Sequence, residues 1–241
     1  MEKEVKKVKD NLKEILQVKN QTSTSADLYF YGDIVSSWWG AWDDTDQYPE
    51  SIKNFLDEHK GKDLNIYVNS GGGSVFAGLA IYNMLKRHEG QKIVYVDGLA
   101  ASIASVIALA GDKVIIPNTA SFMIHKPWGW SSGNANDFRK MANDLDSIEK
   151  CILNVYEENL KEGVSIDTIK QMVEEETWLT GEEACNFFNV ELVEEKNIVA
   201  CSSEYFDSYK HLPSKFKNSK IKQIKNDQEE IEKLRLELQL I

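Results

Sequence analysis

The chain has 241 residues and a net charge of −11, and 42% of its residues are hydrophobic and 28% charged. This composition is typical of a globular protein with a substantial core, and it excludes a disordered polymer. The acidic excess lies in residues 21–213, which carry a charge of −15, so the basic surface that nucleic acid requires is missing from the body of the chain.

The sequence predicts a cytoplasmic protein without a membrane segment. Its longest apolar run, Leu99–Ala110, is interrupted by two serines and is shorter than the roughly 20 residues of a membrane span. The N-terminus alternates Lys and Glu and lacks the apolar region of a secretory signal. Three cysteines without a C-x-x-C pair predict neither a disulfide framework nor a zinc site, which suits a reducing compartment.

Three parts are expected along the chain: a helical N-terminal arm and linker (1–26), an α/β domain (27–200) and a polar C-terminal tail with a short coiled-coil-like helix (201–241). In the α/β domain, short apolar runs between turn residues predict strands at 28–31, 64–68, 92–96, 113–116 and 121–124. Helical periodicity predicts helices at 49–59, 74–88, 101–110, 134–160, 166–175 and 181–188. Strands that alternate with helices of this length predict a largely parallel sheet.

Four histidines limit the search for a general base. His59, His88 and His211 are expected at the surface, because each stands among charged or polar residues. His125 follows the apolar segment 122–124, so it is expected at the carboxyl end of a buried strand, the edge where open α/β sheets bind ligands. There it is either a structural residue or a base, and a base would become active as the pH rises past its reference pKa of about 6.5.

Ser102 is the candidate nucleophile. It is expected in the first turn of the predicted helix 101–110, after Gly98-Leu99-Ala100-Ala101, a stretch with little side-chain bulk. The N–H groups and the dipole at a helix N-terminus can stabilise a developing oxyanion. The alternative is a helix cap or a small residue that permits close packing, a role that fits Ser105 better.

A glycine run, Gly71-Gly72-Gly73, lies between a predicted strand and a predicted helix, without the Gly-Lys-Ser/Thr of a P-loop. A nucleotide site is therefore the weaker interpretation, and the alternative is a loop whose backbone approaches a substrate carbonyl, with the Gly73 N–H as an oxyanion donor. The acid that would orient His125 is not selected by spacing, because three glutamates stand together at 174–176. Each is expected in solvent, and one that faces inward would suffice.

Four segments taken together resemble one family. They are Asn69-Ser70-Gly71-Gly72-Gly73, Gly98-Leu99-Ala100-Ala101-Ser102, Met123-Ile124-His125-Lys126-Pro127 and Trp178-Leu179-Thr180-Gly181-Glu182-Glu183-Ala184. In order and spacing they resemble the proteolytic subunit of the Clp protease family, most closely its phage and prophage branch of head-maturation proteases, over about residues 27–197. The resemblance implies a Clp/crotonase-type α/β fold of repeated ββα units with a projecting handle helix.

The resemblance also implies roles for individual residues. Ser102 matches the nucleophile and His125 the general base, and the oxyanion donors would be the N–H groups of Gly73 and Ile103, with Gly72 beside them in the substrate-binding loop.

Three features depart from the family pattern. Glu176 takes the position that is Asp in housekeeping subunits, so a longer carboxylate must fold back to reach the same imidazole nitrogen. Gly71 replaces the usual Pro of its loop. The tryptophan-rich segment 38–42 and the tail beyond residue 201 have no housekeeping counterpart.

The implied function is that of a serine endopeptidase that forms homo-oligomeric rings and needs no cofactor or metal. For a phage protein, the substrates would be capsid or scaffold proteins in the host cytoplasm, with no requirement for an ATP-driven unfoldase, although an ATPase partner stays open. No nucleic-acid or membrane partner is expected. Two alternatives remain: a crotonase-like acyl-CoA enzyme, which shares the fold and the oxyanion hole, and a non-catalytic assembly protein that keeps only the rings.

Overall fold

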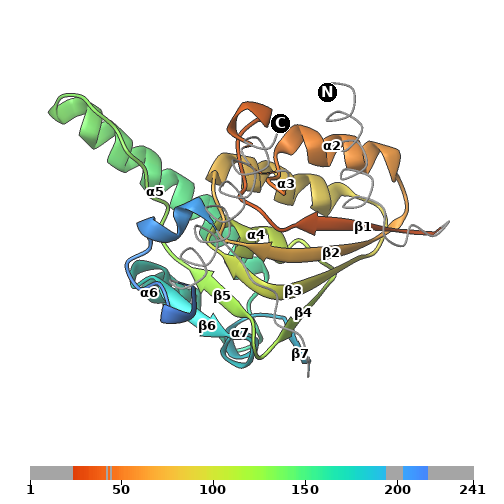
Figure 1. Ribbon diagram of the computed structural model, residues 1–241. Helices are drawn as coiled ribbons and strands as arrows, with labels where there is room; N and C mark the ends of the chain where they lie inside the picture. The colour runs from red at the N-terminus through yellow and green to blue at the C-terminus, as the bar shows by residue number, and fades with distance from the viewer. Residues whose placement is uncertain (1–23, 42, 44, 194–202, 217–241) are drawn as a thin grey trace, which may run out of the picture.

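A seven-stranded sheet forms the centre of the protein in the computed structural model, which describes residues 24–41, 43, 45–193 and 203–216 (Figure 1). The strands are β1 (Ser25–Phe30), β2 (Asp63–Ser70), β3 (Lys92–Ala101), β4 (Lys113–Pro117), β5 (Ser121–Ile124), β6 (Thr177–Thr180) and β7 (Glu191–Val193). Five of them pair in parallel in the order β1-β2-β3-β4-β7. The predicted parallel α/β sheet is confirmed, and β5 branches from the end of β3 with β6 antiparallel beside it.

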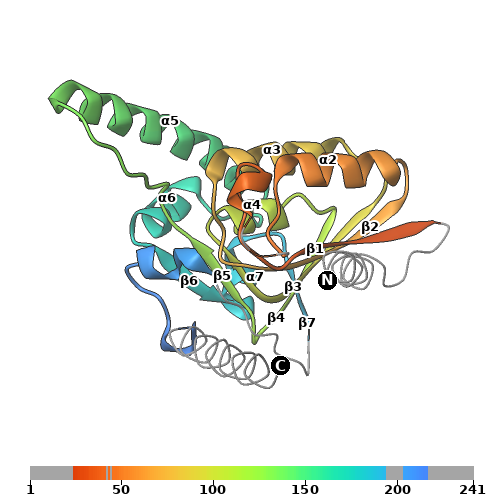
Figure 2. The same cartoon turned by 45° about the horizontal axis from the view of Figure 1, so that its top comes forward.

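Helices cover the sheet and one of them leaves it. They are α2 (Pro49–Glu58), α3 (Val75–Arg87), α4 (Ile103–Ala108), α5 (Ala135–Glu158), α6 (Ile166–Glu174) and α7 (Gly181–Phe187), with 3₁₀ turns η1 (Trp38–Gly40) and η2 (Glu204–Ser208). Helix α3 packs against α2 and α4, and α5 projects from the body as a long arm (Figure 2). Among the described residues, no helix combines the length and the apolar character that a membrane crossing demands.

Capping residues explain where the helices begin. The side chains of Asn134 and Thr180 accept hydrogen bonds from backbone N–H groups in the first turns of α5 and α7. The side chains of Asp137 and Glu183 accept hydrogen bonds from the N–H groups of Asn134 and Thr180, which completes two capping boxes. Pro49 stands in the first turn of α2, where its missing N–H has no helical partner to lose. The predicted helices agree with the observed bounds to within two residues at each end.

Strand β3 is longer than the sequence predicts. Its first half alternates, with Val94 and Val96 buried under the helices and Tyr95 half-buried on the opposite face, where its ring stacks on Tyr67. Alternation then stops, and the segment from Leu99 to Ala101 is buried on both faces. The prediction that the strand ends at 96 was wrong, because β5 pairs with those last residues and extends the sheet.

Two histidines expected at the surface are less exposed than predicted. His59 is buried, its Nδ1 lies 2.7 Å from the Phe55 carbonyl oxygen, and its ring stacks on the Phe55 ring. His88 is half-buried, and its Nε2 lies 2.7 Å from the Lys62 carbonyl oxygen. His59 contacts a carbonyl in the last turn of α2 and His88 one in the loop after that helix, where backbone carbonyls lack helical partners. The flanking charges that suggested exposure did not reveal these contacts.

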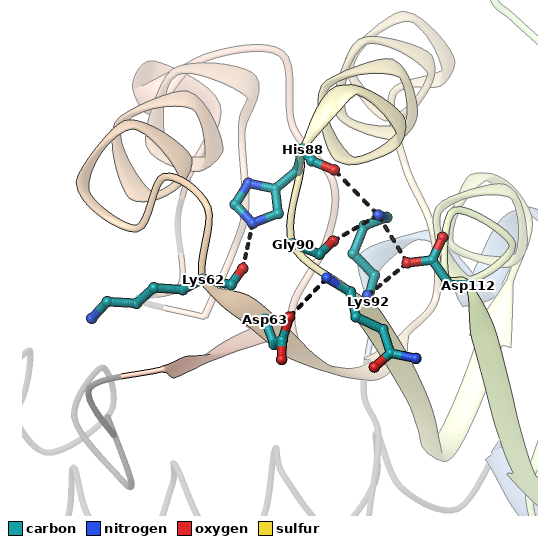
Figure 3. A network of polar contacts seen from close by, with 7 residues as sticks. Lys62, Asp63, His88, Gly90, Lys92 and Asp112 are labelled. Carbon is teal, nitrogen blue, oxygen red and sulfur yellow. Dashed lines mark hydrogen bonds and ion pairs between the residues drawn. The ribbon is translucent and has the colours of Figure 1, made fainter.

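A buried lysine completes the network around the loop between α3 and β3 (Figure 3). Lys92 is 5% exposed, and its Nζ donates hydrogen bonds to the carbonyls of His88 and Gly90 and lies 3.0 Å from the Asp112 carboxylate. A buried ammonium needs such partners, because an unpaired charge in the interior is costly. His88 therefore belongs to a structural cluster at this loop.

Candidate active site

Ser102 and His125 follow two strands that lie side by side. In the parallel pairing of β3 and β5, Ala101 stands opposite Met123, so both chains leave the sheet at the same edge. The Ser102 N–H donates to the Met123 carbonyl at 3.0 Å. Beyond the strands the side chains meet, with His125 Nε2 2.7 Å from Ser102 Oγ. The structure thus brings the candidate nucleophile and the candidate base into hydrogen-bond contact.

The backbone of Ser102 has an unusual conformation, with φ 55° and ψ −127°. The residue is the N-cap of α4, not part of its first turn as predicted, because β3 continues to Ala101 and the helix begins only at Ile103. A positive φ at a non-glycine residue costs on the order of 1–3 kcal/mol and concentrates at functional sites.

Ser105, one turn further on, has the packing role that the sequence favours. It is fully buried, its Oγ donates to the Ser102 carbonyl at 2.6 Å, and the same oxygen lies 2.8 Å from the Tyr156 hydroxyl. With both partners inside the core, the Ser105 hydroxyl supports the turn that carries Ser102 and does not face the cavity.

The glycine loop approaches Ser102 closely. Gly72 and Gly73 have φ of +100° and +142°, which other residues rarely adopt. A Cβ on Gly72 would lie 2.8 Å from Ser102 Cβ, and one on Gly73 would lie 2.1 Å from the Ile34 carbonyl oxygen. Within the described residues, no hydrogen bond occupies the N–H of Gly73 or of Ile103, so both can donate to a ligand beside Ser102.

Glu176 is the inward-facing member of the three glutamates. In the antiparallel pairing of β5 and β6, Ile124 stands opposite Thr177, so the next pair outward is His125 and Glu176. Glu176 is 8% exposed and has a φ of 52°, whereas the two glutamates before it are exposed. Spacing alone left this choice open and the family resemblance implied Glu176, which the register of the two strands places beside His125.

The carboxylate of Glu176 is held by a different part of the chain. Among the described residues, the hydrogen bonds that it accepts come from the backbone N–H groups of Lys210 and His211, at 2.9 and 2.7 Å, and from Trp178 Nε1 at 3.4 Å. None of them comes from His125. The structure therefore brings the acid beside the imidazole and its charge within electrostatic reach, with the carboxylate bound to the later segment.

Burial sets the charge state of the imidazole. Desolvation is the main reason that the pKa of His125 falls from 6.5 to about 4. The negative charge of Glu176 raises this pKa in part, and the positive charge of Lys210 lowers it further. At neutral pH the imidazole is therefore uncharged and free to accept a proton. His125 contacts a hydroxyl through its Nε2, as a general base must.

A cavity of about 370 Å³ opens beside Ser102 and His125. Its apolar wall comes from the start of α3, the segment after β5, and α5, and includes Val75, Phe76, Pro127, Trp128, Met141, Leu145 and Ile148. Trp128 thus lines the cavity, whereas Trp130 is 85% exposed and is not part of its wall. In the described part of the chain, no three His, Cys, Asp or Glu side chains are grouped to hold a metal ion.

Sequence reasoning missed the segment 203–216, which we call the C-terminal strap. The chain after residue 201 was predicted to be a polar tail, yet Phe206, Tyr209 and Phe216 are buried against Leu99, Ala101 and Met123 at the ends of β3 and β5. The signal was present as four aromatic residues in a polar stretch, but their partners are distant in the sequence. The coiled-coil-like part of the tail and the N-terminal arm lie outside the described residues.

The profile of the Clp protease family matches residues 48–196, which is more than half of the chain and includes Ser102, His125 and Glu176. The chain belongs to the Clp protease family. Its family assignment from the four sequence segments is confirmed at this level, and the C-terminal strap lies beyond the matched region.

Curated members of the Clp protease family are similar to this chain over about half its length. The proteins named ATP-dependent Clp protease proteolytic subunit from Bacteroides fragilis and Ligilactobacillus salivarius are each 35% identical, over 52% and 55% of this chain. The protein of the same name from Porphyromonas gingivalis is 31% identical over 57%. The chain spans 60%, 68% and 62% of the lengths of the three relatives, in the order given.

Proposed function

We propose that this chain is a serine endopeptidase of the Clp proteolytic-subunit type, with Ser102, His125 and Glu176 as its Ser-His-acid triad. The observation that carries the proposal is the 2.7 Å contact between Ser102 Oγ and His125 Nε2 at a strained residue beside a cavity. A nucleophile within hydrogen-bond reach of a neutral base is the arrangement that acyl-enzyme hydrolysis needs.

The steps follow from the positions of the groups. His125 takes the Ser102 proton as Oγ attacks the peptide carbonyl, and the N–H groups of Gly73 and Ile103 stabilise the oxyanion, with Gly72 allowing the close approach. The imidazolium then protonates the leaving amine, and a water molecule, activated by the same imidazole, releases the acyl group. Glu176 stabilises the imidazolium by its charge.

The cavity favours a peptide substrate that places an apolar side chain beside the scissile bond, because most of its wall is apolar. A crotonase-like acyl-CoA enzyme would gain little from a Ser-His pair, which makes it the weaker alternative. Within the peptidase proposal, the resemblance to head-maturation proteases suggests capsid or scaffold proteins of a phage or prophage as substrates. The curated relatives are named as subunits of an ATP-dependent protease. The alternative is therefore that a partner ATPase delivers protein substrates to this chain.

The test of the proposed function is covalent labelling. A fluorophosphonate probe reacts with a serine that a neighbouring base activates, so the folded protein should be labelled at one residue, and peptide mapping should identify Ser102. Labelling at Ser105, or binding of acyl-CoA by a protein that the probe does not label, would contradict the proposal.

The activity should persist to unusually low pH. Because burial lowers the pKa of His125 to about 4, the base is uncharged above that value, and kcat/KM should rise with pH through a midpoint near 4 and stay level from about pH 5.5 to 7. The measurement is peptide hydrolysis across pH 3–8, with the folded fraction followed by circular dichroism at each pH. A midpoint near 6.5, the reference value for an exposed imidazole, would show that His125 is hydrated in solution or is not the base.

Assembly is the second property that we propose from the family resemblance. The projecting helix α5 carries an apolar stripe that includes Phe138, Ile152 and Val155. The stripe is buried at its inner end, at Ile152 and Val155, and at its outer end Phe138 is 51% exposed. Soluble monomers rarely leave a large apolar patch in water, so we expect a ring or paired rings in solution. Light scattering should give the mass of several subunits, and removal of residues 217–241 should leave it unchanged. A full-length monomer would contradict the ring.

A further inference from the structure

The C-terminal strap, residues 203–216, lies over the strand ends that carry the proposed triad (Figure 2). Phe206, Tyr209 and Phe216 are buried with Leu99 and Ala101, the residues that lead into Ser102, and with Met123, two residues before His125. The strap is therefore packed as part of the core that supports the site, and it belongs to the portion of the chain that the family profile does not match.

The glycine loop leaves room for the strap, and Asp33 binds the first residue of the strap. A Cβ on Gly71 would lie 2.4 Å from Ser203 Cβ, so any other residue at position 71 would displace the strap. Next to this contact, Ser203 Oγ donates to Asp33 Oδ1 at 2.5 Å, and the Glu204 N–H donates to Oδ2 of the same carboxylate at 3.1 Å. Asp33 is only 8% exposed, and a buried carboxylate needs donors of this kind.

Tyr209 links the strap to both halves of the proposed site. Its hydroxyl donates a short hydrogen bond to the Gly71 carbonyl. This carbonyl lies in the same loop as the Gly73 N–H, the proposed oxyanion donor. Its ring meets the His125 ring edge to face, with 5.2 Å between the ring centroids. One buried side chain thus contacts both the oxyanion loop and the base.

The next two residues of the strap hold the acid. The N–H groups of Lys210 and His211 donate to the two carboxylate oxygens of Glu176, at 2.9 and 2.7 Å. Such paired N–H groups fix the position of a carboxylate. Because Glu176 has a longer side chain than Asp, it has more rotamers to restrict, and the two N–H groups of the strap restrict them.

We propose that the C-terminal strap is a working part of the catalytic site, in which the Lys210–His211 backbone positions the Glu176 carboxylate beside His125 and the Tyr209 hydroxyl positions the glycine loop. Tyr209 is thus a positioning residue, and the inference rests on the proposed peptidase function. The strap does not block the site, because Ser102 and His125 are in contact with the strap in place, and the cavity beside them remains open with Tyr205 and Tyr209 in its wall.

The main test removes one N–H group from the strap of the full-length protein. Lys210→Pro lacks the donor to Glu176, and it is tolerated by the preceding backbone, since Tyr209 is extended at φ −86° and ψ 130°. Lys210→Ala is the matched variant, because it loses the same side chain and keeps the N–H. We expect kcat for a peptide substrate to be about 10- to 100-fold lower in Lys210→Pro than in Lys210→Ala, with KM little changed, because a displaced carboxylate no longer stabilises the His125 imidazolium by its charge.

A double-mutant cycle separates positioning from a general loss of structure. If the proline acts through Glu176, the difference between Lys210→Pro and Lys210→Ala should vanish when both also carry Glu176→Gln. The same difference in both backgrounds would indicate a purely structural effect and would overturn the proposal, as would equal kcat values for the proline and alanine variants.

A second variant keeps the test decisive if Lys210→Pro does not fold. Tyr209→Phe retains the ring against His125 and loses only the bond to the Gly71 carbonyl. Its matched control is Tyr95→Phe, on the opposite face of the sheet. Tyr209→Phe should lower kcat and the rate of fluorophosphonate labelling about tenfold without a change in KM, and equal rates in the two variants would refute a positioning role. If the protein without substitutions showed no hydrolysis that depends on Ser102, that result would instead overturn the proposed function itself.

Discussion

The Ser102→Ala variant should lose peptide hydrolysis by about 10⁶-fold in kcat, the effect of removing the nucleophile from a serine protease triad. This corresponds to about 8 kcal/mol of transition-state stabilisation. The loss is large because Ser102 Oγ is the atom that forms the acyl bond, and because His125 Nε2, 2.7 Å away, then has no hydroxyl to activate. Fluorophosphonate labelling should disappear with it, whereas the mass measured by light scattering should not change.

The matched control is Ser105→Ala, in the same helix. Ser105 is buried and bonded to Tyr156 and to the Ser102 carbonyl, so its loss leaves the Tyr156 hydroxyl without this partner and should lower the stability by about 1–2 kcal/mol. The variant should nevertheless keep its activity and its label. Hydrolysis that persists in Ser102→Ala, or that disappears in a folded Ser105→Ala, would assign the nucleophile to a different residue.

Local signals in the sequence predicted most of the elements of the fold. Helices such as α5 carry their own capping residues and an apolar stripe, and the strands β4 and β5 coincide with apolar runs between turns. Both signals depend on residues close together in the chain, so they can be found without knowledge of the partners. The glycine run was equally visible, because residues other than glycine rarely adopt the φ values of +100° and +142° found at residues 72 and 73.

The features that were missed depend on contacts between distant segments. The end of β3 is a strand because β5 lies beside it, and the turn before β6 places Glu176 opposite His125 only through the register of that pair. Alternation along one strand contains no information about its neighbour. The same reason explains His59, whose charged neighbours suggested a surface position although its imidazole contacts a helix carbonyl in the interior.

The candidate site combines both kinds of signal. Ser102 and His125 were selected from local features, a helix start and an apolar strand, and the structure places their side chains in contact. The acid and its support were not local. Glu176 accepts hydrogen bonds from residues 34 and 35 positions further along the chain, in a segment whose polar composition predicted a solvated tail. A site that is completed by a distant segment can be recognised from the sequence only in part.

The Glu176→Gln variant should show the second-largest loss, about 10⁴-fold in kcat by analogy with the replacement of a triad Asp by Asn. Two effects act together. The amide lacks the negative charge that stabilises the buried imidazolium. Its NH₂ group would also face an N–H of the strap, at Lys210 or His211, and two donors cannot form a hydrogen bond. Because a glutamine cannot accept both bonds with its oxygen in the same place, the side chain should also lose its fixed position.

The neighbouring glutamates provide matched controls for this prediction. Glu175 is exposed, where it bonds to Gln171, and Glu174 is exposed in an ion pair with Lys126, so Glu175→Gln and Glu174→Gln should change kcat less than about threefold. The pH profile adds a second readout. Since the charge of Glu176 raises the pKa of His125, its removal should move the midpoint of any residual activity to lower pH. A near-normal Glu176→Gln variant beside an inactive Glu175→Gln or Glu174→Gln variant would transfer the role of the acid to that neighbour.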